Sequence, residues 1–217
     1  MVSNNINYPQ KKLLEYLLSG NRLKSSETVQ DYYNSCNSII EVYESLIKPV
    51  MYEVGDMWEK NKISVASEHM ASAIVEAILN EFYEEVVSKK KHNKNILLAC
   101  VENEYHQIGV KMISDVFEMH GWNSHFLGAN TPTKDLVDYA KTIKPEIMAL
   151  SVSLYFNIPV LEKMLSNIRK AFEDMTVLIG GQAFRHGGHE IFKEHKNVCL
   201  LHGINEVEQY LNTMINE

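Results

Sequence analysis

The pattern of apolar and polar positions changes once along the chain, close to residue 90. Before that point, apolar side chains recur every three or four residues, which is the spacing of one face of an amphipathic helix. After it, short apolar runs alternate with helical patterns, as in strands and helices that follow one another. The sequence predicts a helical bundle over residues 1–88, a polar linker over 89–94 and an α/β domain over 95–217.

The N-terminal part predicts a four-helix bundle. Pro9 fits the first turn of a helix, and Ser64 is a typical N-cap. Pro49 falls inside the third apolar pattern, where it must either kink the helix or start a new one, because proline has no amide hydrogen to donate. The predicted helices cover residues 9–19, 27–36, 39–58 and 65–87.

The C-terminal part predicts βα units in succession. The strands cover residues 95–101, 123–127, 146–151, 176–180 and 198–202, and the helices lie near 109–120, 133–143, 157–172, 187–195 and 204–215. Short parallel strands joined by helices build a sheet that is covered on both faces. We expect an α/β fold with the flavodoxin-like, or Rossmann-like, strand order 2-1-3-4-5.

Residues with chemical potential gather directly after three of these strands. The first strand is followed by Glu104-Tyr105-His106-Gln107-Ile108-Gly109, the third ends in Ser151-Val152-Ser153, and the fourth ends in Gly180-Gly181. In the expected order these three strands are neighbours. The segments therefore share one rim of the sheet, at the carboxyl ends of the strands, where open α/β sheets bind ligands.

Each segment offers a different kind of contact. The neutral imidazole of His106 can coordinate a metal, and the Glu104 carboxylate can hydrogen-bond its other nitrogen and so fix the tautomer. Serine hydroxyls at a strand end can bind a buried heterocyclic base. Gly109 leaves room at the start of a helix, while Gly180 and Gly181 allow the backbone to approach a ligand closely.

Together, the three segments resemble the signature of the cobalamin-binding domain family, which is an acidic residue-x-His-x-x-Gly, then Ser-x-Leu, then Gly-Gly. The resemblance implies that cobalamin binds with its own nucleotide base displaced and with His106 as the lower cobalt ligand. It implies cofactor contacts at Glu104, Tyr105, His106, Gln107, Ile108, Gly109, Ser151, Val152, Ser153, Gly180 and Gly181. Ser153 stands where the family has leucine, which leaves the packing of the nucleotide tail open.

A second motif lies in the helical part, where nine residues separate Trp58 from the pair Glu68-His69. It resembles the Trp-x9-Glu-His motif of light-sensing cobalamin proteins of the CarH type, in which a helical bundle caps the upper face of adenosylcobalamin. The resemblance implies that Trp58 packs against the adenosyl group, that Glu68 contacts it, and that His69 can replace it on cobalt after photolysis. Taken singly, Trp58 fits ordinary core packing and Glu68-His69 an exposed helix surface, but their joint spacing favours the motif.

Composition and charge limit which binding partners and which cellular compartment we expect. The net charge of −7 argues against direct binding of nucleic acid, and the basic run at 88–94 is interpreted as a solvated linker. The three cysteines are odd in number, which argues against a disulfide framework and favours a reducing cytoplasm. They also show no metal-ligand spacing. No apolar run has the length of a signal core or a membrane span. His186 and His189 are three residues apart but lack further ligands for a metal site.

These observations lead to one main hypothesis and two alternatives. The main hypothesis is a cytoplasmic light sensor or signalling module that binds adenosylcobalamin and is not itself an enzyme. Since the chain shows no basic recognition helix, its output is expected to pass through a protein partner, self-association or a separately encoded DNA-binding subunit. The alternatives are a corrinoid carrier protein for methyl transfer, which would hold methylcobalamin, and a cobalamin storage or delivery module.

Overall fold

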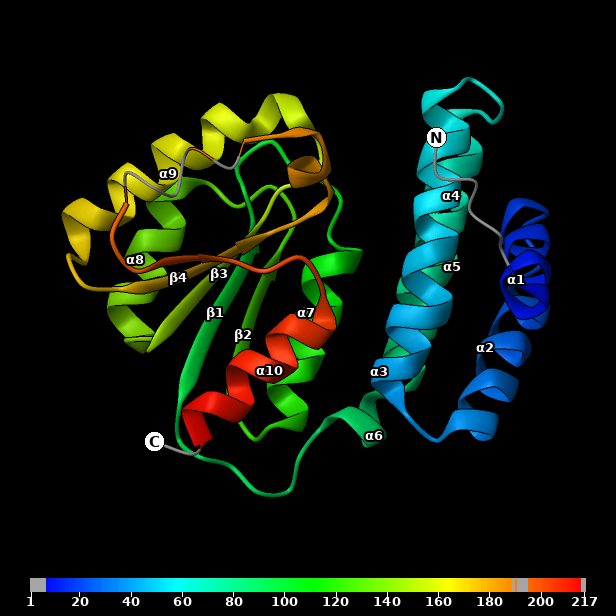
Figure 1. The fold of residues 1–217 in the computed structure, drawn as a ribbon, viewed down its shortest axis with the longest axis horizontal. Coiled ribbons are helices and arrows are strands. Elements are labelled where there is room, and N and C mark those ends of the chain that lie inside the picture. Colours follow the sequence, from blue (N-terminus) through cyan, green and yellow to red (C-terminus); the bar gives the residue numbers. More distant parts are fainter. Residues whose placement is uncertain (1–6, 189, 191–194, 216–217) are drawn as a thin grey trace. The chain divides into compact units, whose positions relative to one another are not determined.

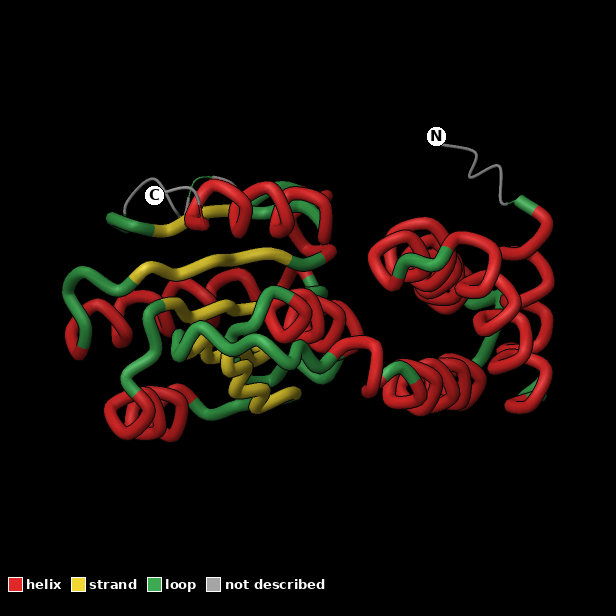
Figure 2. Tube along the Cα trace, turned by 90° about the horizontal axis from the view of Figure 1, so that it is seen from below, coloured by secondary structure: helices red, strands yellow, loops and turns green. Residues whose placement is uncertain are grey.

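The computed structural model describes residues 7–188, 190 and 195–215. Contacts divide the chain into two compact units, which we call unit 1 (Met1–Glu85) and unit 2 (Val86–Glu217) (Figure 1). Unit 1 is helical, and unit 2 contains a sheet with helices on both faces (Figure 2). Within the described residues, no helix has the length and apolar character needed to cross a lipid bilayer.

Most helices of unit 1 occur where the apolar pattern predicts them. They are α1 (Tyr8–Leu18), α2 (Arg22–Cys36), α3 (Ile39–Glu41), the π-helix η1 (Val42–Ile47), α4 (Lys48–Glu59), α5 (Val65–Glu81) and α6 (Tyr83–Val86). As predicted, Ser64 is the N-cap of α5, and its hydroxyl accepts a hydrogen bond from the amide of Ser67. Two boundaries differ from the prediction. The Asn21 side chain caps α2 through the amide of Lys24, so that helix starts five residues earlier than residue 27.

The last predicted helix is interrupted at Phe82, so α5 ends at Glu81 instead of near residue 87. The backbone of Phe82 leaves the helical conformation, and its buried ring packs edge-on against Tyr33 at 5.2 Å between centroids. The chain then continues as the short helix α6. Burial of this aromatic ring therefore shapes the end of the bundle.

Pro49 lies in the first turn of α4, and the chain stays helical from η1 into α4. Because proline has no N–H, the carbonyl of Ser45 cannot receive the usual α-helical hydrogen bond from four residues later. The side-chain nitrogen Nε2 of Gln10 in α1 donates to that carbonyl instead, at 2.7 Å. The turn before Pro49 widens into η1, in which the amide of Lys48 donates to the carbonyl of Tyr43, five residues earlier.

The sheet of unit 2 has the predicted strands and the predicted order. Its strands are β1 (Asn95–Cys100), β2 (Asn123–Gly128), β3 (Ile147–Ser151), β4 (Thr176–Gly180) and β5 (Val198–Leu200). All neighbouring pairs are parallel, in the order β2-β1-β3-β4-β5. The flavodoxin-like arrangement is therefore confirmed.

Helices cover both faces of this sheet. They are α7 (Ile108–Met119), α8 (Thr133–Ile143), α9 (Ile158–Ala171) and α10 (Ile204–Ile215), with short 3-10 turns η2 (Tyr155–Asn157) and η3 (Gln182–His186). The pairs α7–α10 and α8–α9 are in contact, and the two pairs lie on opposite faces (Figure 1). The helix predicted over residues 187–195 lies largely outside the described residues.

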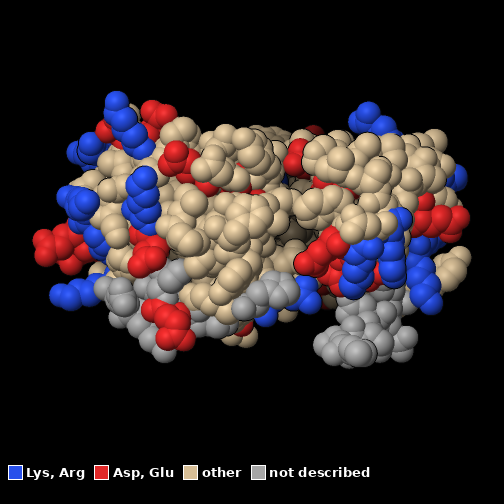
Figure 3. Space-filling model, turned by 90° about the horizontal axis from the view of Figure 1, so that it is seen from above, with Lys and Arg blue, Asp and Glu red and all other residues tan. Residues whose placement is uncertain are grey.

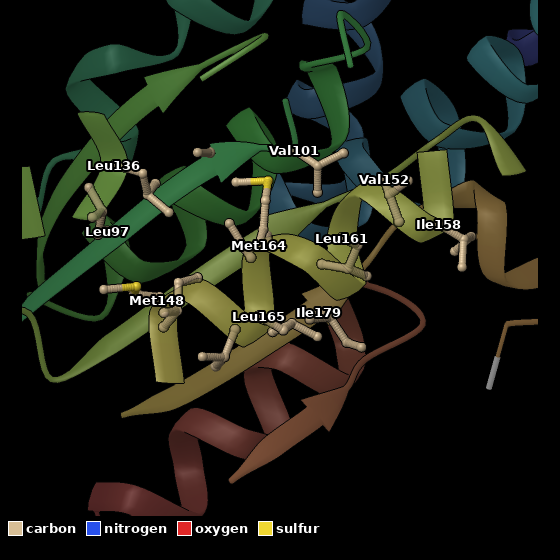
Figure 4. Packing of buried hydrophobic residues seen from close by; sticks show 14 of the residues in the cluster. Leu97, Val101, Leu136, Met148, Val152, Ile158, Leu161, Met164, Leu165 and Ile179 are labelled. Carbon is tan, nitrogen blue, oxygen red and sulfur yellow. The ribbon is translucent and has the colours of Figure 1, made fainter. Parts of the chain in front are cut away.

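The face under α8 and α9 holds an apolar cluster. Alternate residues of β1, β3 and β4 point to this face, because side chains alternate along a strand. Figure 4 shows Leu161, Met164 and Leu165 of α9 in one apolar cluster with Leu97 and Met148 of the sheet. This buried layer fixes the strands whose carboxyl ends form the rim described below.

Part of the basic run before β1 packs against the rest of unit 2. Lys91 forms an ion pair with Glu118 of α7, and the ammonium group of Lys94 lies 5.4 Å from the ring centroid of Trp122. On the face shown in Figure 3, Lys and Arg side chains alternate with Asp and Glu side chains and form no continuous basic surface.

Candidate functional site

Three neighbouring strands bring the predicted segments to one rim. Cys100 of β1 is paired with Ser151 of β3, and Ser151 is paired with Gly180 of β4. The loop with Glu104 and His106 follows β1 directly. The structure therefore brings together the three segments that the sequence placed at one edge of the sheet.

The carboxylate of Glu104 is the centre of this rim and is fully buried. One oxygen, Oε1, accepts from the backbone amide of His106 and from Nδ1 of its ring. The other oxygen, Oε2, accepts from the amides of Ser153 and Leu154, both at 2.9 Å, and from Nδ2 of Asn157 at 3.2 Å. Glu104 thus links the loop after β1 to the loop after β3.

These contacts decide the charge of Glu104 and the tautomer of His106. Burial raises the pKa of the Glu104 carboxyl, but the hydrogen bonds from His106, Leu154 and Ser153 outweigh it and lower the pKa to about 2. The carboxylate is therefore ionised at neutral pH. It accepts the Nδ1 hydrogen of His106, which leaves the lone pair of a neutral ring on Nε2. The imidazole side chain remains 41% exposed at the rim.

Asn157 and Leu154 are contributors that the sequence did not reveal. Asn157 is buried at the end of η2, immediately before α9, and its amide group donates both to Glu104 and to the carbonyl of Asn103. Leu154 contributes only a backbone amide, which no sequence motif can mark. The one available signal was the position of Asn157 between a strand and a helix, and many asparagines share it.

The other residues of the first segment have different environments. Gln107, Ile108 and Tyr105 were expected to contact a cofactor. The side-chain oxygen of Gln107 accepts from the amide of Ala129 at 3.0 Å, so it supports the loop after β2. Ile108 begins α7 and is half-buried, whereas the ring of Tyr105 is 68% exposed at the rim.

The segment after β3 places its three residues in three environments. Ser151 is buried, and its hydroxyl has no hydrogen-bond partner within the part of the chain that the structure describes. Val152 points into the apolar cluster under α9 (Figure 4). Ser153 uses its backbone amide to bind Glu104. Since no hydrogen bond within the protein occupies it, the Ser151 hydroxyl is a polar group at this strand end that is suited to a ligand.

The glycines at the rim serve different purposes. Gly181 has φ +116°, and a Cβ there would lie 2.1 Å from the carbonyl oxygen of Val152. A Cβ on Gly180 would lie 2.8 Å from the carbonyl oxygen of Leu201. Both glycines are therefore already required by contacts within the protein. Gly109 differs, because a Cβ there would meet nothing within 4 Å.

The second motif forms a compact polar cluster on α5 of unit 1. The carboxylate of Glu68 is largely buried; Oε2 lies 2.5 Å from Nδ1 of His69, and Oε1 accepts from the hydroxyl of Ser72 at 2.8 Å. The His69 side chain is 74% exposed. The indole of Trp58, near the end of α4, is 37% exposed, so it is not the ordinary core residue that Trp58 alone suggested.

The two histidines of the two motifs share one local arrangement. His106 and His69 each have Nδ1 against a buried carboxylate of a nearby residue, and each remains accessible to solvent. A carboxylate at Nδ1 is the partner typical of metal-binding histidines, because it orients the ring and strengthens Nε2 as a ligand. Among the described residues, no three metal-ligating side chains converge on one point. His189 of the weighed histidine pair lies outside the described residues.

Comparisons with known proteins agree with this geometry. A B12 binding domain model matches residues 94–209, and a second B12 binding domain model matches residues 9–82. The HTH-type transcriptional repressor CarH of Myxococcus xanthus is 25% identical over 162 residues, which is 74% of this chain and 50% of that protein. The dimethylamine corrinoid protein 1 of Methanosarcina acetivorans is 27% identical over 147 residues, covering 65% of this chain and 68% of that protein.

A solved structure shows the same fold over both chains. The monomethylamine corrinoid protein of Methanosarcina barkeri superposes with a TM-score of 0.79 at 16% sequence identity, covering 95% of this chain and 98% of that one. By contrast, this chain spans about half the length of the HTH-type repressors CarH and CarA. The chain belongs to the B12-binding domain family and is a cobalamin-binding protein.

Proposed function

We propose that unit 2 binds cobalamin with the nucleotide base of the cofactor displaced and with His106 as the lower cobalt ligand. The observation that carries this proposal is the contact of His106 Nδ1 with the buried, ionised Glu104, because it leaves the lone pair of the ring on Nε2. A corrin ring supplies the equatorial nitrogens of cobalt itself. One protein histidine is therefore sufficient for the lower axial position.

We propose that the rim also binds the displaced nucleotide tail. Ser151 supports this proposal, because its hydroxyl lies at the end of β3 and has no hydrogen-bond partner within the described residues. Glu104, Tyr105, Gln107, Ile108, Val152, Ser153, Gly180 and Gly181 are proposed to shape this side of the site. For Gln107, Val152, Gly180 and Gly181, we propose that this role is indirect, since their side chains or Cβ positions face other parts of the protein.

Gly109 provides a direct test of whether space at the rim is kept for the cofactor. We expect Gly109→Ala to leave the free energy of unfolding unchanged or raised by up to about 1 kcal/mol, because alanine favours helices. We expect the same change to raise the dissociation constant for cobalamin about tenfold, because the added methyl group occupies space that the cofactor needs. Denaturation and titration with hydroxocobalamin measure the two effects.

Gly181→Ala is the matched contrast, because its Cβ would collide with Val152 and the free protein should lose stability. Unchanged cobalamin affinity in Gly109→Ala would show that the open space has no role in binding.

We further propose that the protein is a light-responsive signalling module whose upper cobalt ligand is the adenosyl group. The support is local to unit 1: an exposed indole at Trp58, and His69 oriented by the buried Glu68 as His106 is oriented by Glu104. Bound adenosylcobalamin supplies a cobalt–carbon bond that light can break. Trp58 offers an aromatic surface for adenine, Glu68 an acceptor for its polar groups, and His69 a ring nitrogen for cobalt.

The output of such a module requires a further molecule. Curated relatives include HTH-type transcriptional repressors, of which this chain spans about half. We propose that a protein partner or self-association transmits the signal and that the module itself performs no catalysis. Loss of the adenosyl group would then act by shifting a conformational equilibrium of the protein.

Illumination of the protein loaded with adenosylcobalamin tests the role of His69. We expect wild type to end in a stable spectrum with histidine on both axial positions. His69→Ala should respond to light but end in the spectrum that the same variant gives with hydroxocobalamin in the dark. Absorption spectra before and after green light, with and without oxygen, record the outcome.

The matched control is His125→Ala. His125 is another histidine at the surface; it lies on the edge strand β2, and its ring forms a hydrogen bond with the hydroxyl of Tyr139. It should behave as wild type. If His69→Ala and wild type reach the same lit spectrum, His69 is not an upper ligand, although cobalamin binding through His106 would stand.

The second candidate function is a corrinoid carrier for methyl transfer, with methylcobalamin as the bound form. It is favoured by the dimethylamine corrinoid protein, of which this chain covers 68%. A carrier needs its upper face open to a separate methyltransferase and has no use for His69 as a ligand. It therefore predicts that His69→Ala changes neither the lit spectrum nor methyl transfer.

A further inference from the structure

A single asparagine in the loop after β2 contacts three consecutive residues of the loop that carries His106. The amide of Asn130 donates to the carbonyl of Glu104 at 2.7 Å. Its side-chain oxygen accepts from the amide of Asn103 at 2.9 Å, and its side-chain nitrogen donates to the hydroxyl of Tyr105 at 3.2 Å. The backbone on both sides of the Glu104 carboxylate is thereby held from outside its own loop.

The conformation of Asn130 explains why asparagine suits this position. Its φ is +47°, in the left-handed region, where glycine is least strained and asparagine is among the best tolerated of the other residues. Asn103, its partner across the contact, also lies in this region with φ +68°. Glycine would satisfy the backbone alone at position 130. Asparagine adds an acceptor and a donor, and both are used.

The loop that carries Asn130 is itself fixed. Gln107 accepts from the amide of Ala129, and its oxygen fills the space beside Gly128, where a Cβ would lie 2.7 Å away. Gln107 directly follows His106. The two loops therefore support each other on both sides of the histidine, through Asn130 on one side and Gln107 on the other.

We infer that Asn130 is a positioning residue for the lower cobalt ligand: it fixes the backbone of Glu104, and through the Glu104 carboxylate it fixes the ring of His106. This inference rests on the proposed ligation of cobalt by His106. Asn157 acts on the Glu104 carboxylate directly, whereas Asn130 acts on the backbone that directs the carboxylate. Loss of an orienting partner of a metal-binding histidine commonly lowers metal affinity about 10- to 100-fold.

The test compares Asn130→Gly, which keeps the left-handed backbone but removes the side chain, with Asn130→Asp, which keeps the acceptor for Asn103. We expect Asn130→Gly to lower the fraction of hydroxocobalamin in the histidine-bound spectrum and to raise its dissociation constant about tenfold. Asn130→Asp should recover most of the histidine-bound spectrum. Tyr105→Phe isolates the contact to the tyrosine hydroxyl.

The matched control is Asn197→Gly, because the backbone of Asn197 is also left-handed, with φ +54°, and its side chain also forms a hydrogen bond, from Nδ2 to the carbonyl of Asp174. Asn197→Gly can lower the stability of the protein but should leave the spectrum of bound hydroxocobalamin unchanged. A spectrum of Asn130→Gly identical to wild type, while His106→Ala differs from wild type, overturns this inference alone. Identical spectra for wild type and His106→Ala overturn both the inference and the proposed lower ligand.

Discussion

We expect Glu104→Gln to destabilise unit 2 by about 3 to 5 kcal/mol and to abolish the histidine-bound form of the cofactor. Oε2 of Glu104 accepts three hydrogen bonds from the loop after β3, and Oε1 accepts two from His106. A glutamine has only one acceptor oxygen. Whichever way the glutamine amide is turned, its NH₂ group faces either the donors of the loop after β3 or those of His106. The donors that face the NH₂ group lose their acceptor in the protein interior.

Denaturation followed by tryptophan fluorescence measures this effect within unit 2. The chain has two tryptophans, Trp58 in unit 1 and Trp122 in unit 2, so a Trp58→Phe background leaves a reporter for unit 2 alone. Glu102→Gln is the matched control. Glu102 lies in the same loop and is only partly buried, and the hydrogen bonds given for its carboxylate come from one residue, Thr133. Equal losses of stability in the two variants would contradict the central position that we assign to Glu104.

The framework of the molecule could be predicted because its signals are local and repeated. Strand alternation, helix periodicity and caps such as Ser64 depend on residues close in sequence, and they led to the correct strand order. The order in turn placed Ser151 between Cys100 and Gly180 at the rim. The B12-binding family could be identified because its motif residues stand at fixed distances along the chain.

The contacts that complete the site could not be predicted from the sequence. Asn157 reaches Glu104 across 53 residues of sequence and Asn130 reaches Asn103 across 27, so neither pair forms a local pattern. The amide of Leu154 takes part through its backbone, which is common to nearly all residues. Likewise, the hydrogen bond from the Gln10 side chain to the carbonyl of Ser45 joins α1 to η1, and the sequence alone did not predict it.

The glycines show a similar limit. The sequence suggested that Gly180 and Gly181 allow close approach of a ligand, and the structure shows that neighbouring backbone already excludes a Cβ at both. Gly109 has no such neighbour, so contacts within the free protein do not explain why this rim position is a glycine. The position of a glycine in a sequence indicates where the backbone must approach another group closely, but it does not identify that group.

We expect His106→Ala to have the largest effect on the cofactor. The variant removes the only protein nitrogen that we propose for the lower position, while the buried Glu104 keeps its bonds to Ser153 and Leu154. The fold of unit 2 should therefore survive, because the His106 side chain is partly exposed and lies outside the apolar cluster. Cobalamin affinity should fall at least about 100-fold, in line with the loss of a metal ligand and its orienting pair.

The most direct test of lower ligation by His106 is the absorption spectrum of hydroxocobalamin bound to wild type and to His106→Ala. Addition of imidazole to the variant serves as the control, since it can replace the missing ring at the vacant position. We predict that wild type shows a histidine-bound spectrum, that His106→Ala lacks it, and that imidazole restores it. A His106→Ala spectrum identical to that of wild type, at full occupancy, would contradict ligation of cobalt by His106.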